Sequence, residues 1–296
     1  MIQVPPRTTA SPVHRGAAAS TFDAREETAY ALGVTAFLWG YPLAEYGRTL
    51  PDALRAGGVG WNAFRKFTAL KTAADRFVRT PNNVTIDAYA AFDVGREPVV
   101  IFVPKLERER WYLVQLGDHF DEVFHNIGGT KGQQPGVYVI TGPDCNVEVP
   151  GEMTRLRSRT RVGVAAVRIF VKGDADLPDA LDAQRGFQIM PLSAYLRHGL
   201  AYRPPTTAQL AAAPQDGPKA LRYFERLGHW MRRWLPVSMD SADPLLASFR
   251  QIGLGVARGF EWRGLDDATT RGLARATVAG ERIVDAAWAS TGETTN

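Results

Sequence analysis

Two histidines and several carboxylates lie close together in residues 118–125, which read DHFDEVFH. If this run is an extended strand, alternate side chains share a face, and His119, Asp121 and His125 lie on the same side of a sheet. Two imidazoles and a carboxylate on one face could bind a divalent metal with open coordination positions. The spacing matches no standard zinc signature, and a row of polar side chains also describes a solvated face. We predict no cofactor, with a divalent metal at these three residues as the alternative.

Asp118 and His119 form a candidate acid–base pair, because histidine titrates near neutrality and a carboxylate can orient it. Adjacent residues of a strand point to opposite faces, so this pairing requires a bulge or a turn. An equally good interpretation is that Asp118 braces a turn by accepting backbone N–H groups. Arg110, at the start of the strand predicted over Arg110–Leu116, would hold an anionic group of a substrate. The predicted catalytic residues are therefore Asp118, His119 and Arg110.

Charge and composition exclude several classes of protein. The 296 residues include 35 Lys and Arg against 31 Asp and Glu, spread along the chain, and no basic run interleaved with aromatic residues predicts nucleic-acid binding. The alternating arginines from Arg155 to Arg161 are typical of a solvated strand face. The single cysteine, Cys145, cannot form an internal disulfide. The GxSxG, HExxH and P-loop motifs are absent.

The sequence predicts neither export nor membrane insertion. Its first residues lack the apolar segment of a secretory signal. The longest apolar stretch, residues 29–44, is interrupted by glycine and proline and is shorter than the ~20 residues of a membrane-spanning helix. We therefore expect a cytoplasmic protein with no membrane partner.

Helical patterns stand on either side of a region of strands. Short runs rich in β-branched and aromatic residues, separated by Gly, Pro, Asp and Asn, fill residues 81–192 and predict closely spaced antiparallel strands. A helix is expected before them from about Asp23, as its N-cap, to Trp39, ending at Gly40-Tyr41-Pro42. Further helices are expected after the strands. They are predicted at residues 178–185 and 219–234, from residue 243, and at 273–288.

The predicted fold class is α+β: an antiparallel β-sandwich, jelly-roll or Ig-like, preceded by N-terminal helices and followed by a C-terminal helical region. Residues 1–22 are rich in Pro, Ser, Thr and Ala and read as a disordered arm. We expect a helical lead-in at 23–80, the β-sandwich domain at 81–192, and at 193–296 a helical region that packs on the sandwich.

A series of motifs runs through the first two thirds of the chain. They are Tyr41-Pro42, Trp61-Asn62-x-Phe64, Thr80-Pro81-Asn82-Asn83-x-Thr85, Pro98-Val99-Val100-x-x-Val103-Pro104, Arg110-Trp111-Tyr112-x-x-Gln115-x-x-Asp118, a Gly128/Thr130/Gly132 turn, and Gly136-x-Tyr138-x-x-x-Gly142-Pro143. In this order they resemble the domain-of-unknown-function family numbered 1254. The resemblance covers about Ala29 to Pro191.

The resemblance implies helices leading into a β-sandwich, and no catalytic mechanism. It also implies a companion β-domain of the family numbered 1214, which we expect to be missing here. The family commonly has Asp before the motif threonine and Tyr two residues after it, where this chain has Val84 and Asp87. The chain therefore departs from any chemistry that uses the usual pair, or Asp87 carries part of that chemistry. The binding residues predicted from the motifs and this position are Asn83, Thr85, Asp87, Tyr112 and Gln115.

Three functions are compatible with this sequence. The leading one is an enzyme, cofactor-independent or metal-assisted, that acts on a small organic metabolite in a polar pocket between sheet and helices. The second is a small-molecule-binding protein with the same pocket and no turnover. The third is an assembly module, either a homo-oligomer or the partner of a separate 1214-like chain. Fold-level analogy alone does not choose among them.

Overall fold

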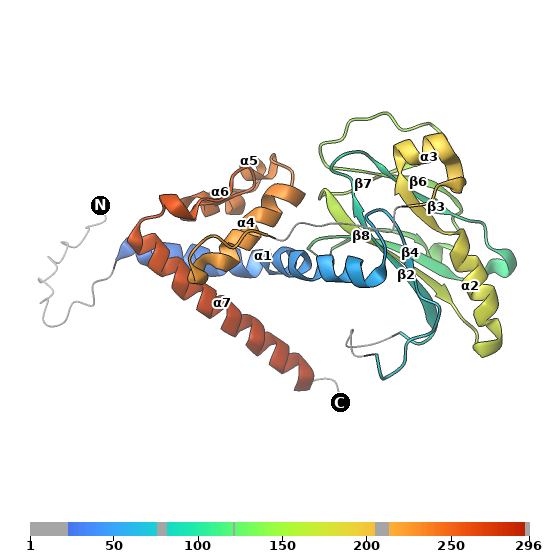
Figure 1. Cartoon of the computed structure of the whole chain (residues 1–296), viewed down its shortest axis with the longest axis horizontal. Coiled ribbons are helices and arrows are strands. Elements are labelled where there is room, and N and C mark those ends of the chain that lie inside the picture. The colour runs from blue at the N-terminus through green and yellow to red at the C-terminus, as the bar shows by residue number, and fades with distance from the viewer. Residues whose placement is uncertain (1–22, 76–81, 121, 205–212, 294–296) are drawn as a thin grey trace, which may run out of the picture.

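The chain forms an α+β structure, described by a computed structural model for residues 23–75, 82–120, 122–204 and 213–293. Figure 1 shows most of the strands gathered at one end of the molecule, and the first helix and the helices of the C-terminal part at the other. The predicted disordered arm, residues 1–22, and Asp121 lie outside the described residues. In the described part, no helix combines the length and the hydropathy that a membrane crossing requires.

Sheet A has five antiparallel strands in the order β1-β2-β8-β4-β5. Its strands are β1 (Arg65–Lys66), β2 (Thr85–Asp93), β8 (Val162–Phe170), β4 (Tyr112–Asp118) and β5 (Val123–Gly128). Alternate residues such as Ile86, Ile169 and Tyr112 lie side by side on one face and are buried. The opposite face, called here the outer face of sheet A, carries Asp87 and Arg168 at directly paired positions.

Sheet B has four strands in the order β7-β6-β3-β9. They are β7 (Thr154–Arg157), β6 (Gly136–Thr141), β3 (Val99–Val103) and β9 (Gln188–Pro191). The β6–β7 pair is parallel, because residues 142–153 carry the chain back before β7 begins, so the expectation of purely antiparallel pairing is wrong there. One apolar cluster takes buried side chains from both sheets, so the sheets pack on each other.

The helices fall into two groups. The short helices α2 (Leu177–Gly186) and α3 (Leu192–His198) lie against the sheets. A second apolar cluster joins α1 (Ala24–Gly57), α4 (Arg222–Trp234), α6 (Pro244–Phe249) and α7 (Asp267–Glu293), with α5 (Met239–Ala242) and the β10 (Leu254–Gly255)–β11 (Gly259–Phe260) hairpin beside them. This cluster reaches sheet A through Ala91 and Val162. The sequence predicts a C-terminal region that packs on the sheets; in the structure it packs chiefly on α1.

Helix α1 begins as predicted and ends much later. The Asp23 carboxylate accepts the N–H groups of Arg25 at 3.0 Å and Glu26 at 3.4 Å, which confirms the N-cap. The predicted end at Pro42 is wrong, because the helix runs through it to Gly57. A Cβ atom at Gly40 would collide with Leu227 of α4, so α1 and α4 pack in close contact. This contact stabilises a continuous helix against the ~3 kcal/mol that an internal proline costs.

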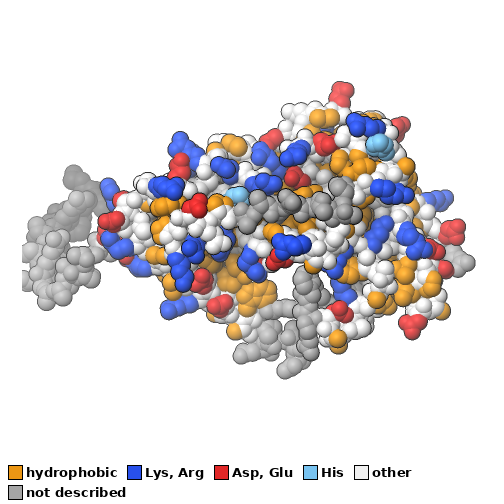
Figure 2. Space-filling view, viewed as in Figure 1, with side chains coloured by type: hydrophobic (Ala, Val, Ile, Leu, Met, Phe, Trp, Pro, Cys, Tyr) orange, Lys and Arg blue, Asp and Glu red, His pale blue; other side chains and the backbone are white. Residues whose placement is uncertain are grey.

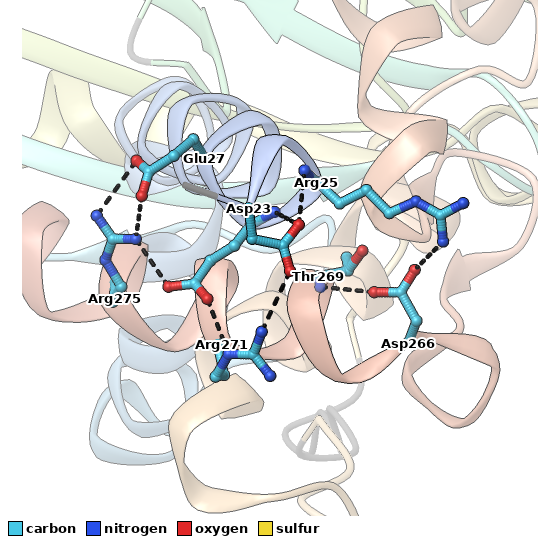
Figure 3. Close-up of polar contacts among 8 residues, drawn as sticks. Asp23, Arg25, Glu27, Asp266, Thr269, Arg271 and Arg275 are labelled. Atoms are coloured by element: carbon cyan, nitrogen blue, oxygen red, sulfur yellow. Dashed lines mark hydrogen bonds and ion pairs between the residues drawn. The ribbon is translucent and has the colours of Figure 1, made fainter. Parts of the chain in front are cut away.

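The start of α1 is joined to the start of α7 by a network of ion pairs (Figure 3). Arg275 Nη1 lies 2.8 Å from Glu26 and 2.7 Å from Glu27, and Arg271 Nε lies 2.8 Å from Glu26. Since several charges share partners, the network holds the two helices together more effectively than an isolated surface pair. Elsewhere Lys and Arg side chains are scattered over the visible face among acidic and uncharged groups, as Figure 2 shows.

Replacing Arg275 by glutamine is expected to lower the melting temperature, because Glu26 and Glu27 lose a shared cation. The loss should shrink in about 1 M NaCl, where exposed charges are screened. Thermal unfolding followed by circular dichroism at low and high salt measures both effects. The control is Arg282→Gln on the exposed end of the same helix, which should leave the melting temperature unchanged. An equal loss in both variants, insensitive to salt, would contradict the network's role.

Candidate functional site

Asp87 is the centre of a polar cluster on the outer face of sheet A. Its side chain is 3% exposed, and its carboxylate accepts hydrogen bonds from Thr85 Oγ1 at 2.8 Å, Tyr89 Oη at 2.9 Å and Lys71 Nζ at 3.2 Å. A buried carboxylate loses its hydration, and donors of this kind compensate for the loss. Thr85, Asp87, Tyr89 and Lys71 are called here the Asp87 cluster.

Local structure explains how these side chains meet. Residues 85, 87 and 89 alternate along β2 with Ile86, Ala88 and Ala90 of the apolar core between the sheets, so all three lie on the outer face. Lys71 comes from the segment that follows β1. That segment is anchored at Asp87 itself, whose carbonyl oxygen accepts the Phe67 N–H at 3.0 Å and Gln184 Nε2 at 2.8 Å. The position of Lys71 therefore depends on contacts with both β2 and α2.

Arg168 of β8 lies directly opposite Asp87 in the strand ladder. Its guanidinium reaches towards β4 and donates to Gln115 Oε1 at 3.2 Å. It is half-buried and forms no ion pair with a carboxylate among the described residues. With Lys71 and Arg168 positive and Asp87 negative, this part of the face has an excess of one positive charge. Such a face favours an anionic ligand.

Tyr89 is the group in this site best suited to donate a proton. Burial raises the pKa of its phenol, and the charge of Asp87 and the hydrogen bond to it act in the same direction. The phenol therefore keeps its proton at neutral pH. Its Oη is already oriented by Asp87. It could act as a general acid towards a ligand bound at Arg168.

The predicted binding residues separate into two groups. Thr85, Asp87 and Gln115 lie together on the outer face, and Asn83 is exposed just before β2. Tyr112 points the other way, into the core between the sheets, where its ring lies 5.3 Å from that of Phe187. Its hydroxyl accepts the backbone N–H of Gln134 at 2.7 Å. The structure therefore gives Tyr112 a packing role at some distance from the other four.

Arg110 and Asp118, two of the predicted catalytic residues, stand at opposite ends of β4. Eight residues of extended chain span about 26 Å, so the two side chains cannot line one small pocket. Arg110 is engaged by Asp176, whose two carboxylate oxygens accept its Nη1 and Nη2 at 2.8 and 2.7 Å. Both side chains of this ion pair are largely buried. The position of the Arg110 side chain is therefore fixed by Asp176, in the turn that leads into α2.

Asp118 and His119 are not joined by a hydrogen bond. Asp118 accepts the backbone N–H groups of Phe120 at 2.9 Å and Glu122 at 3.1 Å, which is the arrangement of a turn brace. His119 is fully buried, and its ring nitrogens have no hydrogen-bond partner within the part of the chain that the structure describes. Its ring lies 4.3 Å from Trp234 of α4 and 4.7 Å from Tyr46 of α1. His119 therefore lies in an aromatic contact between the sheets and the helices.

The metal hypothesis assumed one continuous strand over residues 118–125, and that assumption is wrong. Strand β4 ends at Asp118 and β5 begins at Val123, with a turn between them. His119 is enclosed by aromatic rings, His125 lies on β5, and Asp121 lies outside the described residues. Within the described ranges, no three His, Cys, Asp or Glu side chains are grouped so that they could hold a metal ion.

Sequence reasoning missed Lys71, Tyr89 and Arg168. A signal existed for two of them. Tyr89 lies two residues after Asp87 on the same predicted strand, and Arg168 is a single charge within the apolar strand VGVAAVRIF. Lys71 lies in an irregular segment, where no periodicity marks its direction.

The family comparison concerns the part of the chain that contains this site. Residues 61–191 match the family model described as "Protein of unknown function (DUF1254)". These residues are a DUF1254 domain. The resemblance inferred from the motifs is confirmed for this range, and the Asp87 cluster, Gln115 and Arg168 all lie in the DUF1254 domain. No curated protein matches the chain.

Two solved structures are similar to the chain that carries this DUF1254 domain. The VPA0106 protein from Vibrio parahaemolyticus matches with a TM-score of 0.67 at 19% identity, over 87% of this chain and 59% of that protein. This likeness shows a shared fold, and the chain spans 59% of that protein's length. A putative uncharacterized protein from Burkholderia cenocepacia matches over 86% of this chain and 57% of its own, at 10% identity and a TM-score of 0.28.

Proposed function

We propose that the DUF1254 domain is an enzyme that binds a small organic acid on the outer face of sheet A and acts on it by general acid catalysis, with the donor regaining its proton from water. The observation that carries this proposal is the state of Arg168, a half-buried guanidinium beside the Asp87 cluster whose side-chain partner among the described residues is a neutral amide oxygen. A carboxylate or phosphate bound there would balance the excess positive charge.

The site residues would have distinct roles. Arg168 would bind the anionic group, with Gln115 holding the guanidinium in place. Tyr89 would donate the proton, and Asp87 would orient the phenol. The scaffold is, in this proposal, a β-sandwich of the jelly-roll or Ig-like kind, since one apolar cluster joins both sheets. We propose a cytoplasmic setting, since a chain whose single cysteine is Cys145 has no internal disulfide.

Thermal-shift measurements with a panel of small carboxylates and phosphomonoesters test the site. We expect at least one acid to raise the melting temperature of the unaltered chain. Arg168→Gln should remove this rise, and the matched control Arg197→Gln, at an exposed position of α3, should retain it. The proposal fails if no acid stabilises the protein or if the rise survives in Arg168→Gln.

Tyr89→Phe separates an enzyme from a binding protein. The phenylalanine keeps the ring and removes only the hydroxyl that donates to Asp87. Ligand stabilisation should persist while turnover of the acid falls by about 100-fold or more, the usual contribution of a general acid. Binding with no turnover in either protein would favour the non-catalytic alternative.

Self-assembly is the second candidate, and exposed apolar side chains favour it. Val278, Ile283 and Trp288 of α7 are each about half exposed. Apolar side chains exposed along one helix can be covered by a contact with another chain. A second copy of the chain or a separate 1214-like chain could cover them. Native mass spectrometry of the purified protein measures its oligomeric state. A strictly monomeric protein would contradict self-assembly and favour the enzyme proposal.

A further inference from the structure

A pocket of about 420 Å³ lies where two irregular segments meet, between β3 and β4 and between β5 and β6. Its walls are formed by residues 105, 106 and 109–112 on one side and 129, 132, 133 and 135 on the other, and no member of the Asp87 cluster lines it. Its volume is in the range of sites for small molecules. It is therefore a candidate binding site separate from the one proposed above.

Hydrogen bonds hold the two walls together. The Gln133 side chain donates to the Leu106 carbonyl at 3.1 Å and accepts the Leu106 N–H at 2.9 Å. Close by, the Tyr112 hydroxyl accepts the N–H of Gln134. The pocket is thus formed before any ligand arrives, which lowers the entropic cost of binding.

Glu109 in the wall of this pocket has a strained backbone. Its φ is 48°, in the left-handed region that disfavours residues with a Cβ. The other described non-glycine residue with positive φ is Asn62, a type that tolerates this conformation, and its Oδ1 accepts the Asp93 N–H at 2.9 Å. Strain of this kind gathers at ligand sites, where the position of a side chain matters more than local stability.

The groups that face the pocket define the ligand it would accept. The indole of Trp111 is 42% exposed, an unusually open position for so large an apolar surface. Lys105 and Glu109 are exposed and of opposite charge, and Arg110 is neutralised by Asp176. The lining therefore offers no net charge to an anion or a cation. It offers hydrogen-bond donors and acceptors beside an aromatic face.

We infer that this pocket binds a neutral sugar ring. One face of a pyranose consists of C–H groups that pack on an indole, and its hydroxyls suit the carboxylate of Glu109 and the ammonium of Lys105. Gly129 and Gly132 carry no side chain, so the opposite wall leaves room for the sugar ring. The inference does not depend on the organic-acid site.

Saturation-transfer NMR on the full chain with glucose, N-acetylglucosamine and maltose tests the inference. We expect transfer to the ring protons of at least one sugar. Trp111→Ala should weaken its binding by about tenfold or more, a factor that corresponds to the loss of one aromatic contact. The matched control is Trp288→Ala, which removes an indole that is 50% exposed on α7 and should leave sugar binding unchanged.

Glu109→Gly gives a second test, because a purely structural role of Glu109 would not predict weaker sugar binding in a more stable protein. Glycine accepts the left-handed backbone without strain, so the melting temperature should rise. Sugar binding should weaken at the same time, because the carboxylate is gone. The inference is overturned if no sugar shows transfer at millimolar concentration, if binding survives in Trp111→Ala, or if benzoate or choline binds in the pocket and sugars do not.

Discussion

Asp118→Ala is expected to lower the free energy of unfolding by about 3 kcal/mol, because two backbone N–H groups of the β4–β5 turn lose their acceptor. The carboxylate is buried, so water does not readily replace it. Asp118→Asn keeps one side-chain oxygen and should cost only about 1 kcal/mol. Urea unfolding at neutral pH measures both values.

Arg159→Ala is the control for this prediction. Arg159 lies 3.0 Å from the Asp118 carboxylate, but its side chain is 62% exposed. An exposed cation is screened by water, so its removal should change stability by less than about 1 kcal/mol. If Asp118→Ala proved as stable as the unaltered protein, the turn brace would be wrong. A loss of turnover in Asp118→Asn without a loss of stability would then support the acid–base interpretation.

The strands could be predicted because their signal is local. Alternation and turn residues predict a strand over residues 84–92, and β2 occupies 85–93. The pairing of strands is not local. Arg168 faces Asp87 only because β8 pairs with β2 in one register, and no property of either segment alone fixes that register. The sequence therefore predicted part of the site, including Asp87, and missed Arg168.

Two errors have different physical origins. The end of α1 was misplaced because Pro42 disfavours a helix locally, whereas the contact of Gly40 with Leu227 is made by a helix far along the chain. The grouping of Arg110 with Asp118 was avoidable. Eight residues of extended chain separate the two side chains by about 26 Å, and this span follows from the residue numbers alone.

His119 should make stability depend on pH in a way that a phenylalanine at this position does not. Burial lowers the pKa of His119 from 6.5 to about 3. Below about pH 6.5 the unfolded chain binds a proton that the folded chain does not, so stability falls as the pH falls from 6.5 towards 3. From these values the loss between pH 7 and pH 5 is about 2 kcal/mol.

The comparison of the unaltered protein with His119→Phe isolates this contribution. Phenylalanine keeps an aromatic ring against Trp234 and Tyr46, and it removes no hydrogen bond to the described residues, since the ring nitrogens of His119 make none with them. His125 and His229, whose pKa values burial also lowers, remain in both proteins and cancel in the difference. Urea unfolding from pH 7 to pH 5 should therefore show a smaller loss in the variant. Equal losses would mean that His119 binds its proton in the folded state as readily as in the unfolded chain, and the effect of burial on its pKa would then be wrong.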